Sequence, residues 1–441
     1  MTSVASTASL GRPIHFVAWL VGERLVRSVV TAVVLAAVAR HLAPAGFGVL
    51  NFALAVVGVA MPLAQLGLEG VLVRELVRRP ADAGALLGSA AVLRLAVGAA
   101  CLVAIEAFAL VPRFAAARGA LAVAGLLLLV QAAEVTDLWF RRRVESRPAA
   151  IARLSALLGG AALKLALVAA GAGVVAFVVV QVLEAVFFVG GLAWAYARGD
   201  EKGPAWRWDP ATARALWREG RGFALGALVG SLALRVDQFA VSGWLGAADT
   251  GRYFAALRLI ELPTFVATTA AASLLPALAA DVGRTTLARN FAVLSALGWL
   301  TALGATLAGP WLVPRFFGPD YAAATPILIL QAWACLPLFT GLVRAQYLAV
   351  HSAPGTQLAT AMLTLAGQGV LNFVLVPWLG LTGAACAFLL TQLASAWLFP
   401  LLLPALRPCL KPQWLALREA WKPNFWRELA GVPPAAEIGC P

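Results

Sequence analysis

The chain has 441 residues, of which 61% are hydrophobic and only 12% are charged, and its formal net charge is +13. Apolar stretches of about twenty residues recur along its whole length, and the mean hydropathy of +0.86 excludes an ordinary soluble core. Backbone polar groups in lipid must pair within their own segment, so these stretches are predicted to be helices. The fold class is therefore an all-α polytopic membrane protein.

We predict twelve transmembrane helices joined mostly by short loops. In chain order they are expected at residues 16–39, 46–68, 84–111, 119–139, 150–170, 173–197, 221–245, 251–280, 290–313, 322–350, 356–377 and 381–404. Lys and Arg gather in alternate loops, most strongly at 141–153 and 198–221. Short basic loops stay in the cytoplasm, so both termini are predicted to be cytoplasmic. Because the charge is divided among loops, no nucleic-acid partner is expected.

The sequence lacks the motifs that mark several functional classes of protein. A removable signal peptide has a compact basic region, then an apolar run, then a cleavage site with small residues, and the N-terminal stretch lacks this order of features. The first span is therefore expected to direct insertion into the membrane. The five cysteines show no CxxC spacing, which gives no indication of a disulfide framework or a metal site. No ATP-binding phosphate loop and no HExxH motif occurs. We therefore expect no catalytic site and no cofactor.

The two halves of the chain match each other in three places. LAPAGFGVLNFAL at 42–54 aligns with LGAADTGRYFAAL at 245–257, VPRF at 111–114 recurs at 313–316, and AFVVVQ at 176–181 matches AFLLTQ at 387–392. The conserved order of the matches indicates a duplication. Each copy holds six spans, so the copies share one orientation and are expected to be related by a pseudo-two-fold axis along the membrane normal. This plan favours a binding cavity between the lobes.

The duplication divides the chain into four parts. They are an N-terminal lobe at 1–197, an inter-lobe linker at 198–220, a C-terminal lobe at 221–404 and a cytoplasmic tail at 405–441. In the linker, Asp209 and Pro210 can cap and begin a short helix, while a plain tether is the alternative. In the tail, bulky apolar residues alternate with basic ones, which suits an anionic membrane surface; a disordered tail is the alternative.

Charged residues inside the predicted spans are the candidate functional residues. They are Glu23, Arg24, Arg27, Arg94, Glu106, Glu134, Asp137, Lys164, Glu184, Arg235, Asp237, Arg258, Glu261 and Arg344. A charge at the centre of a lipid-facing helix costs about 2.5 to 3.5 kcal/mol, so most of them must face the bundle interior, a cavity or the interface. We expect structural ion pairs between Glu23 and Arg27, Asp137 and Arg141, and Lys164 and Glu184. Arg344 is expected to extend toward the cytoplasmic face.

Three of these residues lack a partner on their own helix. Pairing of Glu23 with Arg27 leaves Arg24 turned about 100° away. A guanidinium suits an anionic headgroup, because it binds two phosphate oxygens and stays charged; pairing with a distant acid is the alternative. Arg235 and Asp237 lie about 200° apart around one helix, so each needs a partner elsewhere. Cross-pairs of Asp237 with Arg258 and of Arg235 with Glu261 are geometrically reasonable.

Four stretches in chain order carry a family signal. They are LAAVARHLAPAGFGVLNFALAVVGVAMPLAQLGLEGVLVREL at 35–76, RVDQFAVSGWLGAADTGRYFAALRLIE at 235–261, FFGPDYAAATPILIL at 316–330 and LNFVLVPWLGLTGAACA at 371–387. Together they resemble polysaccharide biosynthesis membrane proteins, the oligosaccharide-lipid flippases of the multidrug/oligosaccharidyl-lipid/polysaccharide exporter superfamily. The basic segment after Phe140 departs from the family pattern, which often has a glutamine there.

The resemblance implies two six-helix lobes around a cationic cavity, with alternating access. The implied activity is movement of a polyprenyl-diphosphate-linked oligosaccharide from the cytoplasmic to the periplasmic leaflet of a bacterial inner membrane, for cell-surface polysaccharide synthesis. The implied partners are this substrate and membrane lipids, and contacts with a polysaccharide polymerase and glycosyltransferases are left open. The candidate substrate-binding residues are Arg24, Arg27, Arg94, Arg235, Asp237, Arg258 and Glu261. The resemblance places Arg24 and Arg27 at the diphosphate.

The sequence is compatible with two alternative functions. An ion-coupled small-molecule or drug exporter has a similar architecture, although a positively charged cavity disfavours cationic substrates. A membrane polysaccharide polymerase or lipid-linked glycosyltransferase is disfavoured by the short extracytoplasmic loops.

Overall fold

The computed structural model describes residues 11–142, 147–198, 203–280, 283–351 and 353–419, with side chains from Val30 onward except at Pro148, Arg284, Pro354 and Glu419. Over these residues the chain forms helices, turns and short connections, and no β-strand is present. The all-α prediction is therefore confirmed.

The helices of the first lobe are α1 (Gly11–Ala64), α2 (Leu68–Arg78), η2 (Pro80–Asp82), α3 (Ala83–Ala109), η3 (Pro112–Ala117), α4 (Arg118–Gly125), α5 (Leu127–Val130), η4 (Gln131–Glu134), α6 (Val135–Arg142), α7 (Arg147–Ala169) and α8 (Val174–Arg198). Those that follow are α9 (Pro210–Ala233), α10 (Val236–Trp244), α11 (Ala247–Ala280), α12 (Arg284–Phe317), η5 (Pro319–Ala324), α13 (Thr325–Val350), α14 (Pro354–Trp397), α15 (Phe399–Leu402), η6 (Pro404–Leu406) and α16 (Arg407–Glu419).

Two continuous stretches are too long for one membrane crossing. In the described residues, nine helical segments are long and apolar enough to span a membrane, but Val30–Arg78 has 49 residues and Gly355–Leu402 has 48. At 1.5 Å per residue, each would be about twice as long as the hydrocarbon core is thick. Both bend, α1 at Ala43 and α14 at Gly380. Splitting them there, and counting α9 with α10 as one span bent by 50°, gives the twelve predicted crossings.

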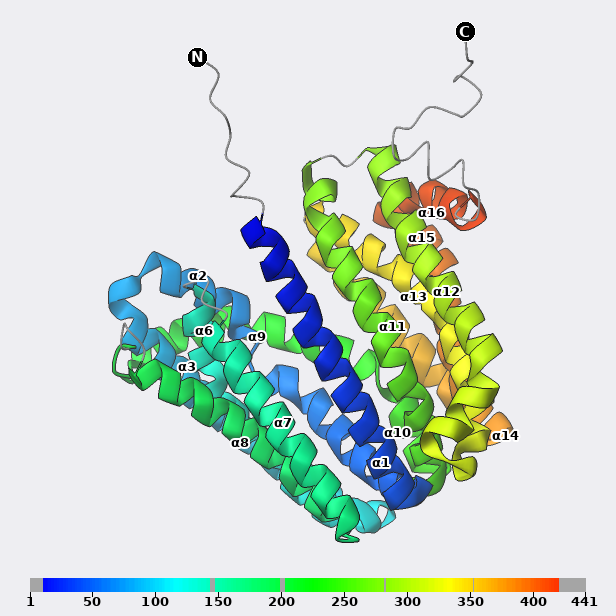
Figure 1. Cartoon of the computed structure of the whole chain (residues 1–441). Helices are drawn as coiled ribbons and strands as arrows, with labels where there is room; N and C mark the ends of the chain where they lie inside the picture. The colour runs from blue at the N-terminus through cyan, green and yellow to red at the C-terminus, as the bar shows by residue number, and fades with distance from the viewer. Residues whose placement is uncertain (1–10, 143–146, 199–202, 281–282, 352, 420–441) are drawn as a thin grey trace.

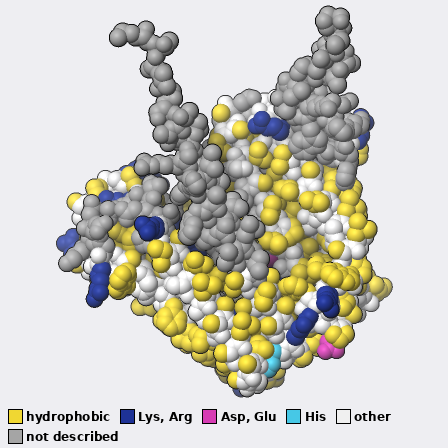
Figure 2. Space-filling view, viewed as in Figure 1, with side chains coloured by type: hydrophobic (Ala, Val, Ile, Leu, Met, Phe, Trp, Pro, Cys, Tyr) yellow, Lys and Arg dark blue, Asp and Glu magenta, His cyan; other side chains and the backbone are white. Residues whose placement is uncertain are grey.

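The surface supports a membrane environment. Large apolar side chains are exposed on the described helices, including Leu307 at 82% and Trp378 at 86%. Figure 2 shows hydrophobic side chains over most of the visible face, with Lys and Arg toward the ends of the molecule. This pattern is the one expected of a lipid-facing surface.

Two predicted spans are less regular than the sequence suggests. The span at 221–245 breaks between α9 and α10, where Arg235 leaves helical geometry with φ −132° and ψ 2°. The span at 119–139 is divided among α4, α5, η4 and α6. In the predicted linker, the carboxylate of Asp209 accepts a hydrogen bond of 2.8 Å from the backbone N–H of Thr212 and caps α9. The capped helix is longer than expected and runs to Ala233.

The two bundles converge at one end of the molecule. Figure 1 shows them close together where α1 bends and further apart toward the end where α1 begins. α1 packs against α11, and α9 contacts both α1 and α14. The described helices therefore have a closed end, at the bend of α1, and a more widely spaced end, where α1 begins.

The closed end is built from the duplicated sequence. Ala43 and Gly246 occupy equivalent positions, and both have a positive φ, 53° and 87°. A Cβ atom added to Gly48 would collide with the carbonyl oxygen of Ala247, and one added to Gly251 would collide with that of Pro44. We call this contact between residues 42–48 and 245–251 the seam. It is symmetric, because each glycine meets the carbonyl four residues before the other.

Side chains around the seam strengthen the closure. The rings of Phe47, Phe317 and Tyr321 form a buried cluster with centroids 5.5 to 6.3 Å apart. The Tyr321 hydroxyl donates a 2.8 Å hydrogen bond to the carbonyl of Ala39. Arg40 donates through Nε to the carbonyl of Phe316 at 3.1 Å, in the last turn of α12, where orphan helix carbonyls favour a cation. The first lobe thus covers the C-terminal end of α12.

The change Ala43→Gly should stabilise the protein. A non-glycine residue at φ 53° and ψ 173° is strained by about 1 to 3 kcal/mol, which exceeds the extra backbone entropy of glycine. We expect the free energy of unfolding to rise by about 1 kcal/mol, measured as a higher thermal midpoint in detergent. The reverse change at the equivalent position, Gly246→Ala, should lower the midpoint. Shifts in the same direction for both variants would contradict the assignment of strain.

The change Gly48→Ala should destabilise the protein. The new methyl group overlaps the carbonyl oxygen of Ala247, so the two helices must move apart, at a cost of about 1 to 3 kcal/mol. Gly243→Ala on α10 is the matched control, because no atom lies within 4 Å of its added Cβ. Thermal unfolding of both variants tests the seam, and an equal response would exclude close packing at Gly48.

Candidate functional site

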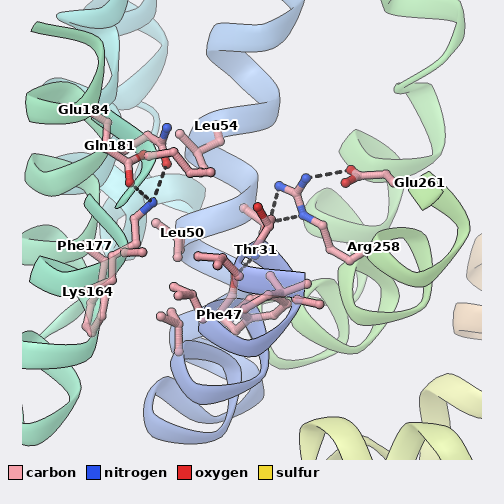
Figure 3. A pocket seen from close by; sticks show the side chains of 18 of the residues that line it. Thr31, Phe47, Leu50, Leu54, Lys164, Phe177, Gln181, Glu184, Arg258 and Glu261 are labelled. Carbon is pink, nitrogen blue, oxygen red and sulfur yellow. Dashed lines mark hydrogen bonds and ion pairs between the residues drawn. The ribbon is translucent and has the colours of Figure 1, made fainter. Parts of the chain in front are cut away.

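A cavity of about 670 Å³ lies between the two lobes. Its walls come from α1, α7 and α8 on one side and from α11 and α12 on the other. Most of its lining is apolar, including Val34, Leu50 and Leu54 of α1. Figure 3 shows two separate polar groups in this lining, one on the α7–α8 wall and one on α11.

The first polar group centres on Arg258 of α11. Its Nη1 lies 2.6 Å from Oε1 of Glu261, one helical turn away. Its Nε and Nη2 donate to Oδ1 of Asn51 on α1, at 3.1 and 2.8 Å. Asn51 is itself held by a 2.8 Å hydrogen bond from Nδ2 to the carbonyl of Phe47. Arg258 therefore connects the two lobes across the cavity.

The second polar group joins α7 to α8. Nζ of Lys164 lies 2.8 Å from Oε1 of Glu184 and 3.2 Å from Oε1 of Gln181. Gly160 provides the space for this arrangement, since a Cβ there would overlap the Glu184 carboxylate. The structure places Lys164 and Glu184 together, as the sequence suggests, and it also places both in the cavity lining.

The described lining is electrically balanced. It contains two basic residues, Lys164 and Arg258, and two carboxylates, Glu184 and Glu261. Each described base lies beside an acid, and the cationic cavity stays a prediction that also depends on Arg24 and Arg27. Three of the predicted site residues lie on α1, but their side chains are outside the part of the chain that the structure describes: Glu23, Arg24 and Arg27.

Arg235 and Asp237 do not line this cavity. Arg235 lies at the break between α9 and α10, where Nη1 donates to Oγ of Ser231 at 2.8 Å, and it has no ion pair in the described part of the chain. Asp237 is 1% exposed and accepts hydrogen bonds from the Tyr253 hydroxyl and from the backbone N–H of Gln238. The expected cross-pairs with Glu261 and Arg258 are not formed, because those two residues pair with each other.

Arg94 lies within the first lobe, away from the cavity. Its side chain is on α3 and the residue is 2% exposed. Its Nε and Nη2 have no hydrogen-bond partner among the described residues. Nearby, Asp137 and Arg141 are joined at 2.7 Å, and Arg141 is also 3.6 Å from Glu69. These residues form a polar group separate from the cavity lining.

Sequence reasoning missed the neutral members of the site. Asn51 and Gln181 carry no charge, and the only sequence signal for them is an amide side chain inside an apolar stretch. Arg344 also differs from expectation. It is 4% exposed and donates through Nη1 to Oε1 of Gln413 on α16 at 2.7 Å, so it fixes α16 to the bundle and does not extend to the surface.

Comparison with known proteins identifies the fold. An inward-facing multidrug resistance MATE family transporter of the MOP superfamily matches with a TM-score of 0.66 at 16% identity, over 88% of this chain and 95% of that one. The lipid II flippase MurJ in an inward closed conformation matches with a TM-score of 0.64 at 12% identity, over 93% of this chain and 94% of that one. At these identities the matches show a shared fold.

A third structure is a MOP superfamily transporter from Pyrococcus furiosus, described as having a binding pocket of reverse polarity. It matches with a TM-score of 0.60 at 14% identity, over 89% of this chain and 93% of that one. No curated protein matches the chain in sequence. The sequence profile of the family described as polysaccharide biosynthesis protein matches residues 37–326, which is more than half of the chain. The chain therefore belongs to the polysaccharide biosynthesis protein family.

Proposed function

We propose that the protein is a flippase that moves a polyprenyl-diphosphate-linked oligosaccharide between the leaflets of a bacterial inner membrane, for cell-surface polysaccharide synthesis. The observation that carries this proposal is the cavity between the lobes, in which Arg258 and Lys164 stand among apolar walls in a chain of the polysaccharide biosynthesis family. The fold shared with a lipid II flippase supports a lipid-linked substrate.

Arg258 is the residue best placed to bind a diphosphate. Its partner Glu261 is 60% exposed in its side chain and can turn away to solvent without burying a charge. A diphosphate can then occupy the released side of the guanidinium with two parallel hydrogen bonds. Lys164, across the cavity, adds a second cation of the kind that binds phosphate as a point charge.

The seam supports alternating access. It closes one end of the inter-lobe cavity, and the basic loops predict that this end is extracytoplasmic. The conformation is accordingly the inward-open member of the proposed cycle, with both termini in the cytoplasm. Opening to the other side requires the two glycine contacts to separate.

A drug exporter is the second candidate, because the fold is shared with MATE transporters and the described cavity charge is balanced. Its carboxylates would be the binding groups for a cationic drug. The two functions therefore predict opposite effects for the two members of one ion pair, Arg258 and Glu261.

We expect Arg258→Gln to weaken binding of a polyprenyl-diphosphate-linked oligosaccharide by about 10- to 100-fold, the value of a charge-assisted hydrogen bond to a buried partner. Glu261→Gln should leave this binding unchanged or tighter, because it frees the guanidinium. Both are measured with the full-length protein in nanodiscs. Arg214→Gln, at an exposed position on α9, is the control for loss of one positive charge.

The reverse pattern would exclude the flippase. If Glu261→Gln weakened binding of a lipophilic cation while Arg258→Gln left the oligosaccharide lipid bound as in the wild type, the cavity would be a cation site. Transport in proteoliposomes, with equal amounts of each variant, should follow the order of the binding data.

Weakening the seam should open the extracytoplasmic side. Thr31 lines the cavity, so a Thr31→Cys variant of the cysteine-free protein reports access to it. We expect Gly48→Ala to raise by about tenfold the rate at which an impermeant maleimide labels this cysteine from the extracytoplasmic face. A tenfold change corresponds to a shift of about 1.4 kcal/mol in the equilibrium between the two conformations. Gly243→Ala is again the control. Unchanged labelling in the Gly48→Ala background would contradict a gating role.

A further inference from the structure

A second pocket lies outside the inter-lobe cavity, at the end of the second lobe. It has a volume of about 470 Å³ and is formed where α16 meets the end of α13 and the start of α12. Figure 1 shows α16 across the ends of these helices, at the end of the molecule where α1 begins. The pocket therefore lies at the more widely spaced end of the molecule.

The helix that forms one wall of the pocket is firmly docked. Gln413 of α16 is fully buried and accepts the hydrogen bond from Arg344 of α13. Cys409 of α16 is also fully buried, and Trp414 packs edge-on against Trp397 with ring centroids 5.5 Å apart. The pocket is thus a defined feature of the folded chain, since its walls are fixed to one another.

The lining of this pocket is basic. Arg407 and Lys411 lie four residues apart on α16 and line it together with His351, which directly follows α13, and no carboxylate is among the described lining residues. Two like charges at this spacing repel each other unless an anion lies nearby. The Nδ1–H of His351 donates to the carbonyl of Tyr347 at 2.8 Å, which leaves Nε2 as its remaining ring nitrogen.

Tyr347 adds a neutral hydrogen-bond donor to the basic lining. Tyr347 lines the pocket and is 9% exposed, and its hydroxyl has no hydrogen-bond partner among the described residues. An accessible phenol hydroxyl in a basic pocket can donate to an oxygen acceptor that carries negative charge.

We infer that this pocket binds the phosphate of an anionic membrane lipid, such as phosphatidylglycerol. A lipid is favoured over a soluble phosphate because Trp414 and Leu415, on the same helix, are 61% and 45% exposed. These apolar side chains would contact acyl chains beside the headgroup, as in interfacial helices. Basic pockets between helices at the cytoplasmic surface are known sites for anionic headgroups.

The test measures binding of short-chain phosphatidylglycerol to the full-length protein in detergent by native mass spectrometry, with phosphatidylcholine as the uncharged reference. We expect one phosphatidylglycerol to bind preferentially. The double change Arg407→Ala with Lys411→Ala should weaken it by about thirtyfold, the factor for two basic residues at an anionic surface. The matched double change Arg214→Ala with Arg218→Ala, at exposed positions on α9, should leave it unchanged.

A single conservative substitution controls for misfolding of the double variant. Tyr347→Phe removes only the hydroxyl and should weaken phosphatidylglycerol binding by about threefold to tenfold, the value of one hydrogen bond. Equal losses in the two double variants would overturn the proposal, because attraction would then be general. Displacement of the lipid by millimolar inorganic phosphate would also overturn it, since a soluble anion would be the occupant.

Discussion

The hydrogen bonds between Arg258 of α11 and Asn51 of α1 join the two lobes within the lining of the cavity, because a buried charge there needs acceptors from both. A guanidinium inside a membrane bundle must find acceptors within the protein, because lipid offers none. Arg258 satisfies this need with one acceptor on its own helix, Glu261, and one on the other lobe. The same contact that fixes the lobes therefore lines the space between them, so binding an anion there would alter the connection between the lobes.

Different kinds of contact hold the helices of one lobe together and close the two lobes against each other. The Lys164–Glu184 pair holds two helices of one lobe, and Gln181 completes its hydrogen bonds. At the closed end, by contrast, the described contacts are backbone against backbone and ring against ring, with Arg40 at helix carbonyls. Contacts of this kind require little desolvation of charge when they form, so they suit an interface that opens and closes repeatedly.

Most of the fold could be predicted from the sequence, because lipid restricts the chain to helices of a known length. The twelve crossings, the duplication and the pairing of Lys164 with Glu184 all follow from hydropathy or spacing. The positions of Arg235 and Asp237 could not be obtained in this way, since angular separation on an ideal helix assumes that the helix continues, and α9 ends at Ala233. Asn51 was missed because a neutral amide gives no charge signal. Arg344 was misplaced because its acceptor, Gln413, lies 69 residues away on a helix beyond the last span.

The symmetry of the seam bears on how the chain arose. Gly48 and Gly251 each need the carbonyl that precedes the other by four residues, which is the relation a two-fold axis imposes on a surface that meets its own copy. In a dimer of unfused lobes, a single glycine would have satisfied both sides of this contact at once. In the single chain the same requirement falls on two positions, so neither glycine can gain a side chain unless the helix that carries the opposing carbonyl moves away. The equivalent positions just before them, Ala43 and Gly246, differ in residue but share a positive φ, so the seam repeats its backbone geometry more closely than its sequence.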